Sequence, residues 1–314
     1  MILTLDAMGG DYAPEETVAG AVMWVQSSEV GILLVGQEEK LRAELVKYDY
    51  DGKRIRIVNA SQVIGMDESA AALRKKQDSS IVVATRLVRE GRADAVISCG
   101  STGAQMAAAT LILGRMEGIE RPPIVAEVPG MSAQKTLLLD VGANVDCKPQ
   151  QLVQFALLGS VYASALHGIE NPRIGLLSNG EEEGKGNKLS IETAALLQDN
   201  KRINFSGNIE GRDLFYDKAD VVVCDGFVGN ILLKTVEGLA RFIAMTCLTE
   251  LGKMPSLFTA LDNSQVGGAP LLGIKGVSIV CHGSSKREAV FNALRIAEQC
   301  VTAQMVEKQQ SALS

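Results

Sequence analysis

The chain of 314 residues is 46% hydrophobic but only 4% aromatic, and its formal net charge is −6. This length allows one large domain or two lobes with an ample core. The scarcity of aromatic rings and the acidic balance argue against a nucleic-acid partner, because nucleic acids are bound by stacked rings and clustered Lys and Arg.

The cysteine and histidine content bounds the chemistry further. Six cysteines are scattered without CxxC spacing and only two histidines are present, which predicts reduced core thiols and no metal site. The N-terminus lacks the basic segment and apolar stretch of a signal peptide, and no run approaches the ~20 apolar residues of a spanning helix. The sequence therefore predicts a cytoplasmic protein.

Short apolar runs alternate with longer helical patterns and glycine-rich turns, which is typical of βα units around a largely parallel sheet. Strands are predicted at 1–6, 31–35, 54–59, 95–99, 124–128, 136–141, 173–177, 204–207, 221–224 and 276–281. Helices are predicted at 15–27, 80–90, 103–113, 150–167, 188–199, 229–250 and 286–306. Without a linker or internal repeat, the pattern favours one α/β unit over 1–314, with two lobes that share one sheet system.

Polar turns at strand ends are the candidate sites, because ligands of open α/β sheets bind beyond the carboxyl ends of the strands. Asp6 ends the first strand and is followed by the pair Gly9 and Gly10, which lets backbone approach a ligand. Asp6 is therefore a candidate site residue. A tight turn in which Asp11 is an ordinary helix cap explains the same residues equally well.

The fourth strand runs into Ser101, Thr102 and Gly103 directly before a helix. A helix N-terminus offers unpaired backbone N–H groups and a positive dipole end, which suits a phosphate. A plain helix cap would account for either hydroxyl and stays open. Arg74 lies in the densest basic cluster of the chain, and its planar fork can bind phosphate through two hydrogen bonds.

Residues 178–187 combine glycines and three acids with Lys185 and Asn187. Such a segment is either a mobile active-site loop or an exposed turn, and the residues do not separate the two. His282 follows the last predicted strand and precedes a glycine and two serines. A lone histidine is usually structural, but at this position it is a candidate general acid or oxyanion donor.

Asp225 and Asn230 flank two glycines after the strand at 221–224 and repeat the strand-end pattern. Apolar residues from 239 onward then cover more than one face of a helix, and Gly252 interrupts the pattern. We expect residues 239–261 to form a helical hairpin that packs in a dimer and touches the membrane surface. A dimer interface alone is the open alternative.

Together these segments resemble the phosphate acyltransferase family of bacterial fatty acid and phospholipid synthesis. The matching strings are LDAMGGDYAP, ALRKKQDSS, STGA, ANVDCKPQQLVQFALLG, GEEEGKGN, NFSGNIEGRD, VVVCDGFVGNILLKTVEG and GGAPLLGIKGVSIVCHGSS. The resemblance implies a three-layer α/β/α sandwich of the isocitrate/isopropylmalate dehydrogenase type, related to the phosphotransacetylases. It also implies a homodimer that moves an acyl group from acyl carrier protein to inorganic phosphate, making acyl phosphate for a glycerol-3-phosphate acyltransferase.

This chemistry requires no cofactor and no metal, because phosphate dianion is already a nucleophile and a thiolate leaves readily. The residues assigned to phosphate are Arg74, Ser101, Thr102, Gly103 and Asn187. The residues assigned to catalysis are His282, Asn230, Lys185, Asp6 and Asp225. The first two would bond the thioester oxygen or assist the thiolate, Lys185 would close over the phosphate, and both aspartates would orient these donors.

Two other activities fit the same fold. A phosphotransacetylase acting on short acyl-coenzyme A is close in chemistry. An NAD-linked decarboxylating dehydrogenase would need clustered metal carboxylates, of which Asp220 with Asp225 is a faint version.

Overall fold

The computed structural model describes residues 1–50, 52–131, 134–252 and 267–313. In these residues the chain forms two compact units, 1–115 with 267–302 and 116–252 with 303–313. Each unit has its own sheet. The strands that were expected in one shared sheet system therefore lie in two, because apolar runs predict strands but not the partners with which they pair.

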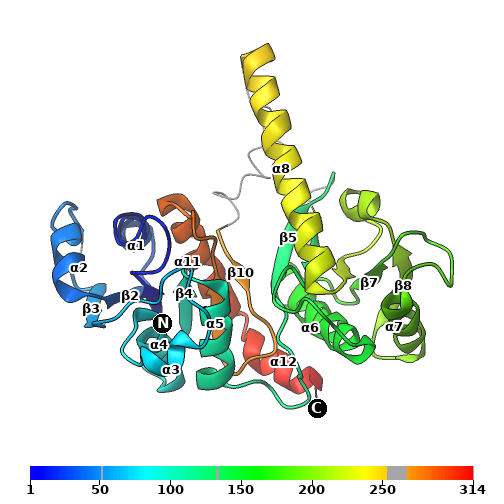
Figure 1. Ribbon diagram of the computed structural model, residues 1–314, viewed down its shortest axis with the longest axis horizontal. Helices are drawn as coiled ribbons and strands as arrows, with labels where there is room; N and C mark the ends of the chain where they lie inside the picture. Colours follow the sequence, from blue (N-terminus) through cyan, green and yellow to red (C-terminus); the bar gives the residue numbers. More distant parts are fainter. Residues whose placement is uncertain (51, 132–133, 253–266, 314) are drawn as a thin grey trace. The chain divides into compact units, whose positions relative to one another are not determined.

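The sheet of the first unit has six strands, parallel except at one edge, where β10 is antiparallel to β11. Their order is β10 (Ala269–Pro270), β11 (Val277–Val280), β4 (Ala95–Ser98), β1 (Ile2–Asp6), β2 (Gly31–Gly36) and β3 (Ile55–Asn59). Strand β2 is a continuous apolar run, because helices cover both faces of the sheet (Figure 1).

Helices cover both faces of this sheet. On one face α1 (Glu15–Ser27) crosses α11 (Arg287–Thr302) so closely that a Cβ on Gly20 would lie 2.6 Å from the Cβ of Val290. On the other face α4 (Ser80–Arg89) receives a hydrogen bond from Thr4 Oγ1 to Ala84 O. The remaining helical segments of this unit are α2 (Glu38–Leu45), α3 (Ala72–Lys75), α5 (Thr102–Ala108) and the π-helical turn η1 (Ala109–Leu113).

The sheet of the second unit has five strands, with β5 antiparallel to β6 and the other pairs parallel. Their order is β5 (Val125–Pro129), β6 (Lys135–Leu139), β9 (Val221–Val223), β7 (Arg173–Leu177) and β8 (Asn204–Ile209). Its helical segments are α6 (Pro149–His167), α7 (Lys188–Asp199), η2 (Gly211–Phe215), α8 (Gly226–Leu251) and α12 (Met305–Leu313). Helix α6 lies close on β9, since a Cβ on Gly159 would be 2.6 Å from Val221 Cγ1.

All ten predicted strands are present, with ends that shift by one or two residues. The predicted helix at 286–306 is two helices, because Gln304 takes a positive φ of 53° between α11 and α12. The prediction missed α2, whose sequence EEKLRAEL buries only three side chains, too few to reveal a helical period. It also missed the four-residue α3 and the two-residue β10.

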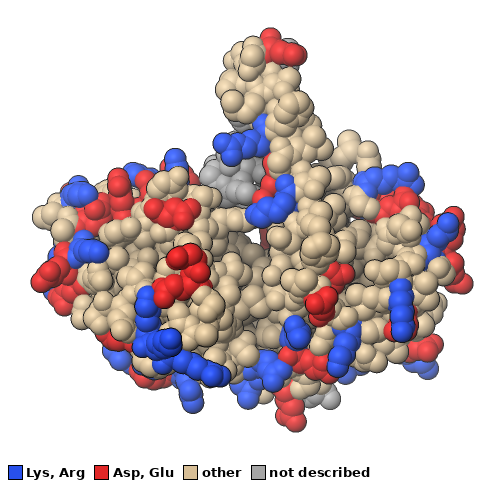
Figure 2. All heavy atoms as spheres, viewed as in Figure 1, with Lys and Arg blue, Asp and Glu red and all other residues tan. Residues whose placement is uncertain are grey.

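Helix α8 extends well beyond the five-stranded sheet of its own unit (Figure 1). The protruding part of α8 is mostly tan in Figure 2, with few charged side chains. Four apolar side chains of α8 are exposed and, at ~100° per residue, lie along one side of the helix; we call Val228, Ile231, Leu239 and Phe242 the α8 stripe. The expected hairpin at 239–261 begins within α8, whereas residues 253–261 lie outside the described residues. No described helix is long and apolar enough to cross a membrane.

Candidate active site

In the first unit, three loops meet at the carboxyl ends of the neighbouring strands β1, β4 and β11. The loop after β1 bonds the loop after β11, where Asp11 N donates to Gly283 O at 2.8 Å. It also touches the loop after β4, since a Cβ on Gly9 would lie 2.7 Å from Gly100 N. Only glycine allows backbones to approach this closely, which explains the glycine pair in the first loop.

Asp6 is buried beneath these loops. Ser98 Oγ donates to its carboxylate at 2.7 Å and in turn accepts from Gly100 N at 3.0 Å. Burial raises the pKa of Asp6, although hydrogen bonds from Ser80 and Ser98 act in the opposite direction. Asp6 therefore contacts the loops and not the solvent. Ser98 was missed because a serine inside an apolar strand carries no sequence signal of its own.

The N-terminus of α5 lies at the same sheet edge. Ser101 precedes the helix, but no side chain among the described residues caps it. Thr102 and Gly103 in the first turn are exposed. The plain-cap interpretation of Ser101 is thus wrong in this structure, and the first N–H groups of α5 stay available to a ligand. Arg74 is exposed on α3, which packs against α5.

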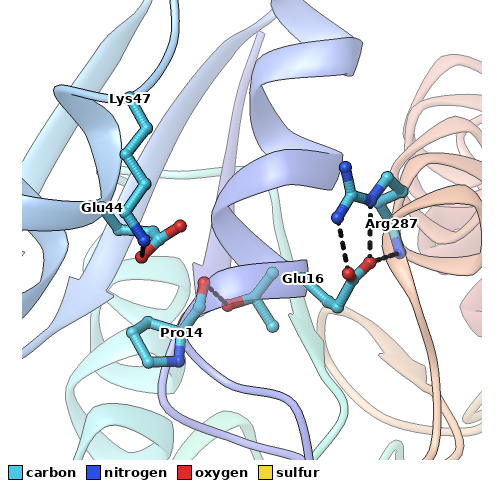
Figure 3. A network of polar contacts seen from close by, with 6 residues as sticks. Pro14, Glu16, Glu44, Lys47 and Arg287 are labelled. Carbon is cyan, nitrogen blue, oxygen red and sulfur yellow. Dashed lines mark hydrogen bonds and ion pairs between the residues drawn. The ribbon is translucent and has the colours of Figure 1, made fainter.

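The starts of α1 and α11 are tied together by Glu16 and Arg287. The guanidinium donates through Nε at 3.0 Å and Nη2 at 2.6 Å, and Arg287 N donates at 2.8 Å (Figure 3). These hydrogen bonds lower the pKa of Glu16. Nearby, Thr17 Oγ1 donates to Ala7 O and Pro14 O. The loops that carry Asp6 and His282 are therefore fixed at their helical ends, and His282 itself is half-buried.

In the second unit, a buried carboxylate organises the turn after β6. Asp140 Oδ1 accepts from Ile124 N at 3.0 Å and Ala143 N at 3.1 Å, and Oδ2 accepts from Asn144 N at 2.6 Å and its Nδ2 at 3.0 Å. Burial raises the pKa of Asp140, against the lowering effect of these bonds. Asp140 falls within a predicted strand and was not among the predicted site residues, although the string ANVDCKPQ begins three residues later.

The start of α8 packs directly on this turn. A Cβ on Gly229 would lie 1.9 Å from Asp140 O, so a side chain there is impossible without displacement of the helix. Asp225 Oδ1 accepts from Val228 N at 2.9 Å and caps α8. Asn230 is exposed and lies beside the turn, since a Cβ on Gly142 would be 3.5 Å from its Cγ.

A cavity of about 340 Å³ lies at the carboxyl ends of β7 and β9. Asn187 and Asp225 both line it, and each caps a helix: Asn187 Oδ1 accepts from Ser190 N at 2.9 Å. Lys185 is exposed on the loop that precedes α7. The cavity is lined by Leu152, Leu176, Leu177, Ser178, Asn179, Gly186, Asn187, Leu189, Ser190, Cys224, Asp225 and Val228.

The ten predicted site residues fall into two groups. The first unit holds Asp6, Arg74, Ser101, Thr102, Gly103 and His282, and the second holds Lys185, Asn187, Asp225 and Asn230. Within the first group Asp6 lies under the loops of one sheet edge. Within the second group Asn187 and Asp225 share one cavity.

The two aspartates that resemble a faint metal-binding pattern, Asp220 and Asp225, have other contacts. Asp220 lies before β9 and Asp225 after it, and Arg173 binds the Asp220 carboxylate through Nε at 3.1 Å and Nη2 at 2.9 Å. Burial acts to raise the pKa of Asp220, but the hydrogen bonds from Arg173 outweigh burial and lower the pKa. These two aspartates therefore do not form a pair. A separate cluster of Glu181, Glu210 and Asp213 already contains the ammonium group of Lys218, 2.6 Å from the first and 2.8 Å from the last.

His167, the last residue of α6, contacts the half-buried carboxylate of Glu127. At the end of α6 its Nε2 lies 3.1 Å from Glu127 Oε1, and the same carboxylate accepts from Tyr162 at 3.2 Å and Lys135 at 2.6 Å. Burial of Glu127 opposes ionisation, but His167 and Lys135 lower its pKa to about 2.

Three of the cysteines are poor nucleophiles. Burial raises the pKa of Cys147 to about 12 and the pKa of Cys224 well above its usual range. Contact with Cys99 and burial do the same for Cys281. A thiol that stays protonated does not attack a thioester.

Comparisons with known proteins show the family of the chain. The sequence profile of a family described as "Fatty acid synthesis protein" matches residues 1–308. The phosphate acyltransferase of Syntrophomonas wolfei is 64% identical over 316 residues, which cover 100% of this chain and 99% of that protein. A phosphate acyltransferase of Desulfitobacterium hafniense is 50% identical over 324 residues, covering 98% and 96%.

The fold has known counterparts as well. A phosphotransacetylase from Streptococcus pyogenes matches with a TM-score of 0.65 at 18% identity, over 98% of this chain and 94% of that one. This likeness confirms the expected α/β fold, and the relatives confirm the resemblance and the enzyme class, acyltransferase, read from the sequence. The chain belongs to the family of fatty acid synthesis proteins in which these phosphate acyltransferases are found.

Proposed function

We propose that this protein transfers the acyl group of acyl carrier protein to inorganic phosphate and so makes acyl phosphate for phospholipid synthesis. The observation that carries the proposal is the uncapped, exposed N-terminus of α5, packed beside the short helix that presents Arg74. Oriented N–H groups and a guanidinium are the donors that a phosphate dianion prefers. The product would serve a downstream glycerol-3-phosphate acyltransferase.

In this mechanism a phosphate oxygen attacks the thioester carbonyl carbon directly. The new C–O bond forms as the C–S bond breaks, and the sulfur leaves as a thiolate that takes up a proton. The phosphate is held by Arg74, Ser101, Thr102 and the Gly103 amide. His282 donates to the carbonyl oxygen or protonates the thiolate, and Asp6 positions the loops around it.

The residues of the second unit have supporting roles in the proposal. Asn230 donates to the thioester, and Asp225 fixes the helix start from which Asn230 projects. Lys185 and Asn187, on the glycine-rich loop before α7, are proposed as further donors to phosphate. No covalent acyl-enzyme is needed, which agrees with the raised pKa of Cys224 and Cys281.

The decisive experiment measures loss of an acyl thioester as a function of phosphate concentration, with carrier-protein and coenzyme A thioesters compared. We expect phosphate-dependent loss with the carrier-protein substrate. Arg74→Ala should raise the phosphate KM at least tenfold, since one charge-assisted hydrogen bond contributes ~1.5–3 kcal/mol. Lys75→Ala, an exposed neighbour on α3, is the matched control and should leave the KM unchanged. Wild-type phosphate kinetics in Arg74→Ala would remove Arg74 from the site.

We further propose that the segment at 239–261 packs in a homodimer interface, through Leu239 and Phe242 of the α8 stripe, and touches the inner face of the cytoplasmic membrane. Exposed apolar side chains on one side of a long helix support the first point. Phe242→Glu should give a monomer in size-exclusion chromatography, whereas Leu248→Glu, about a third of a turn away around the helix, should not. A monomeric wild type would disprove the interface, and failure of the wild type to float with liposomes would leave only the interface.

A further inference from the structure

We propose that the cavity of the second unit receives the part of the acyl chain nearest the thioester, and so contributes to acyl-chain selection. This inference rests on the proposed function. It concerns the walls formed by Leu152, Leu176, Leu189 and Val228.

The walls are apolar and close-packed. Leu152 and Leu176 are 2% and 1% exposed, so they belong to the core of the unit and present a fixed surface. Leu189 and Val228 come from the first turns of α7 and α8 and stand at the rim. A small apolar cavity of this kind gains free energy from an apolar guest in proportion to the area that leaves water.

The polar groups around the cavity argue against a charged guest. No Lys or Arg is among its described lining residues, and its one charged side chain is the carboxylate of Asp225. The described lining therefore offers no cation to an anion such as phosphate. Among the described residues, Ser178 Oγ is buried without a hydrogen-bond partner. That hydroxyl is a donor for the carbonyl oxygen at the head of an acyl chain.

The volume limits how much of a chain can enter. About 340 Å³ is near the lower end of the ~300–1,000 Å³ of ligand pockets. A long acyl chain must therefore leave the cavity again. Val228 belongs both to the cavity and to the α8 stripe, and Ile231 follows it one turn further along the helix. The apolar surface is thus continuous from the cavity onto α8, where the distal carbons can lie.

The test fills the rim with a larger side chain and measures a chain-length series. In Val228→Trp we expect kcat/KM for a hexadecanoyl thioester to fall at least tenfold, and the value for a butanoyl thioester to stay within twofold. Val228 is 39% exposed, so the fold should accept the change, and Leu189→Phe gives a second variant at the same rim. Ile191→Trp, exposed on α7 and outside the cavity, is the matched control and should leave both values unchanged.

The outcomes separate this inference from the proposed function. A wild type that consumes no thioester in the presence of phosphate would contradict the proposed function. A wild type that is active, with the same chain-length profile in both rim variants, would contradict the cavity assignment alone. An equal loss at every chain length would also overturn it, because the cavity would then not distinguish acyl chains.

Discussion

Replacement of Asp140 by Asn tests how the second unit holds its part of the site. The four N–H donors around the carboxylate divide evenly, two on Oδ1 and two on Oδ2. An amide keeps one acceptor oxygen and turns an NH₂ group toward the other two donors. Each buried donor left unpaired costs about 1–3 kcal/mol, so Asp140→Asn should lose about 2–6 kcal/mol. This is a large part of the ~5–15 kcal/mol that stabilises a typical domain.

Activity should fall with stability, because the turn at Asp140 supports the start of α8 from which Asn230 projects. The assay is thermal unfolding by circular dichroism together with steady-state kinetics at a temperature where both proteins are folded. Asp146→Asn changes an exposed carboxylate six residues along the same segment and should behave as the wild type. If Asp140→Asn also unfolded and turned over as the wild type does, the carboxylate would not be the organising group of this turn.

Three further predictions concern stability and mechanism. The pKa of Glu127 is about 2 in the folded state against an ordinary 4.5. The contribution of the ionised carboxylate to the free energy of unfolding is therefore complete above about pH 5 and is lost as the pH falls toward 2. Glu127→Gln should lower the free energy of unfolding by up to about 3 kcal/mol at pH 7 and by less at pH 4, as measured by urea denaturation. Gly229→Ala should destabilise by about 1–3 kcal/mol or more and lower kcat, since the new Cβ meets backbone; Gly238→Ala on the same helix meets nothing within 4 Å and should be neutral or slightly stabilising by differential scanning calorimetry. Mass spectrometry after incubation with an acyl thioester should find no acyl group on Cys224 or Cys281, and a trapped thioester there would overturn direct attack.

Several strands were predictable because they are apolar runs buried on both faces, as β2 and β9 show. The loops at their ends were also predictable, because small and polar residues stand where each run stops. What the pattern does not contain is pairing: β11 inserts beside β4 and β9 beside β6 from far along the chain. The division into two sheets therefore could not be predicted.

Only part of the site could be predicted from the sequence, for a related reason. Asp225 and Asn187 were expected as site residues, and the structure adds that both are helix caps, which strand-end position alone does not distinguish from a ligand contact. Asp140 escaped notice because its role depends on donors from Ile124 and from the following turn. Such a role comes from tertiary contacts, which cannot be predicted from the residue type at one position.

The interleaving of the two units along the chain has a consequence for biosynthesis. The ribosome delivers β1 to β4 early, but the neighbour of β4 in the sheet is β11, which pairs Val277 with Ala95. Until that strand emerges, β4 presents an open row of backbone donors and acceptors, and α1 lacks the helix on which Gly20 packs. The second unit likewise waits for α12, its last segment. The first unit is completed only with α11 and the second only with α12, so nascent chains of this protein should depend on protection from aggregation until these helices have emerged.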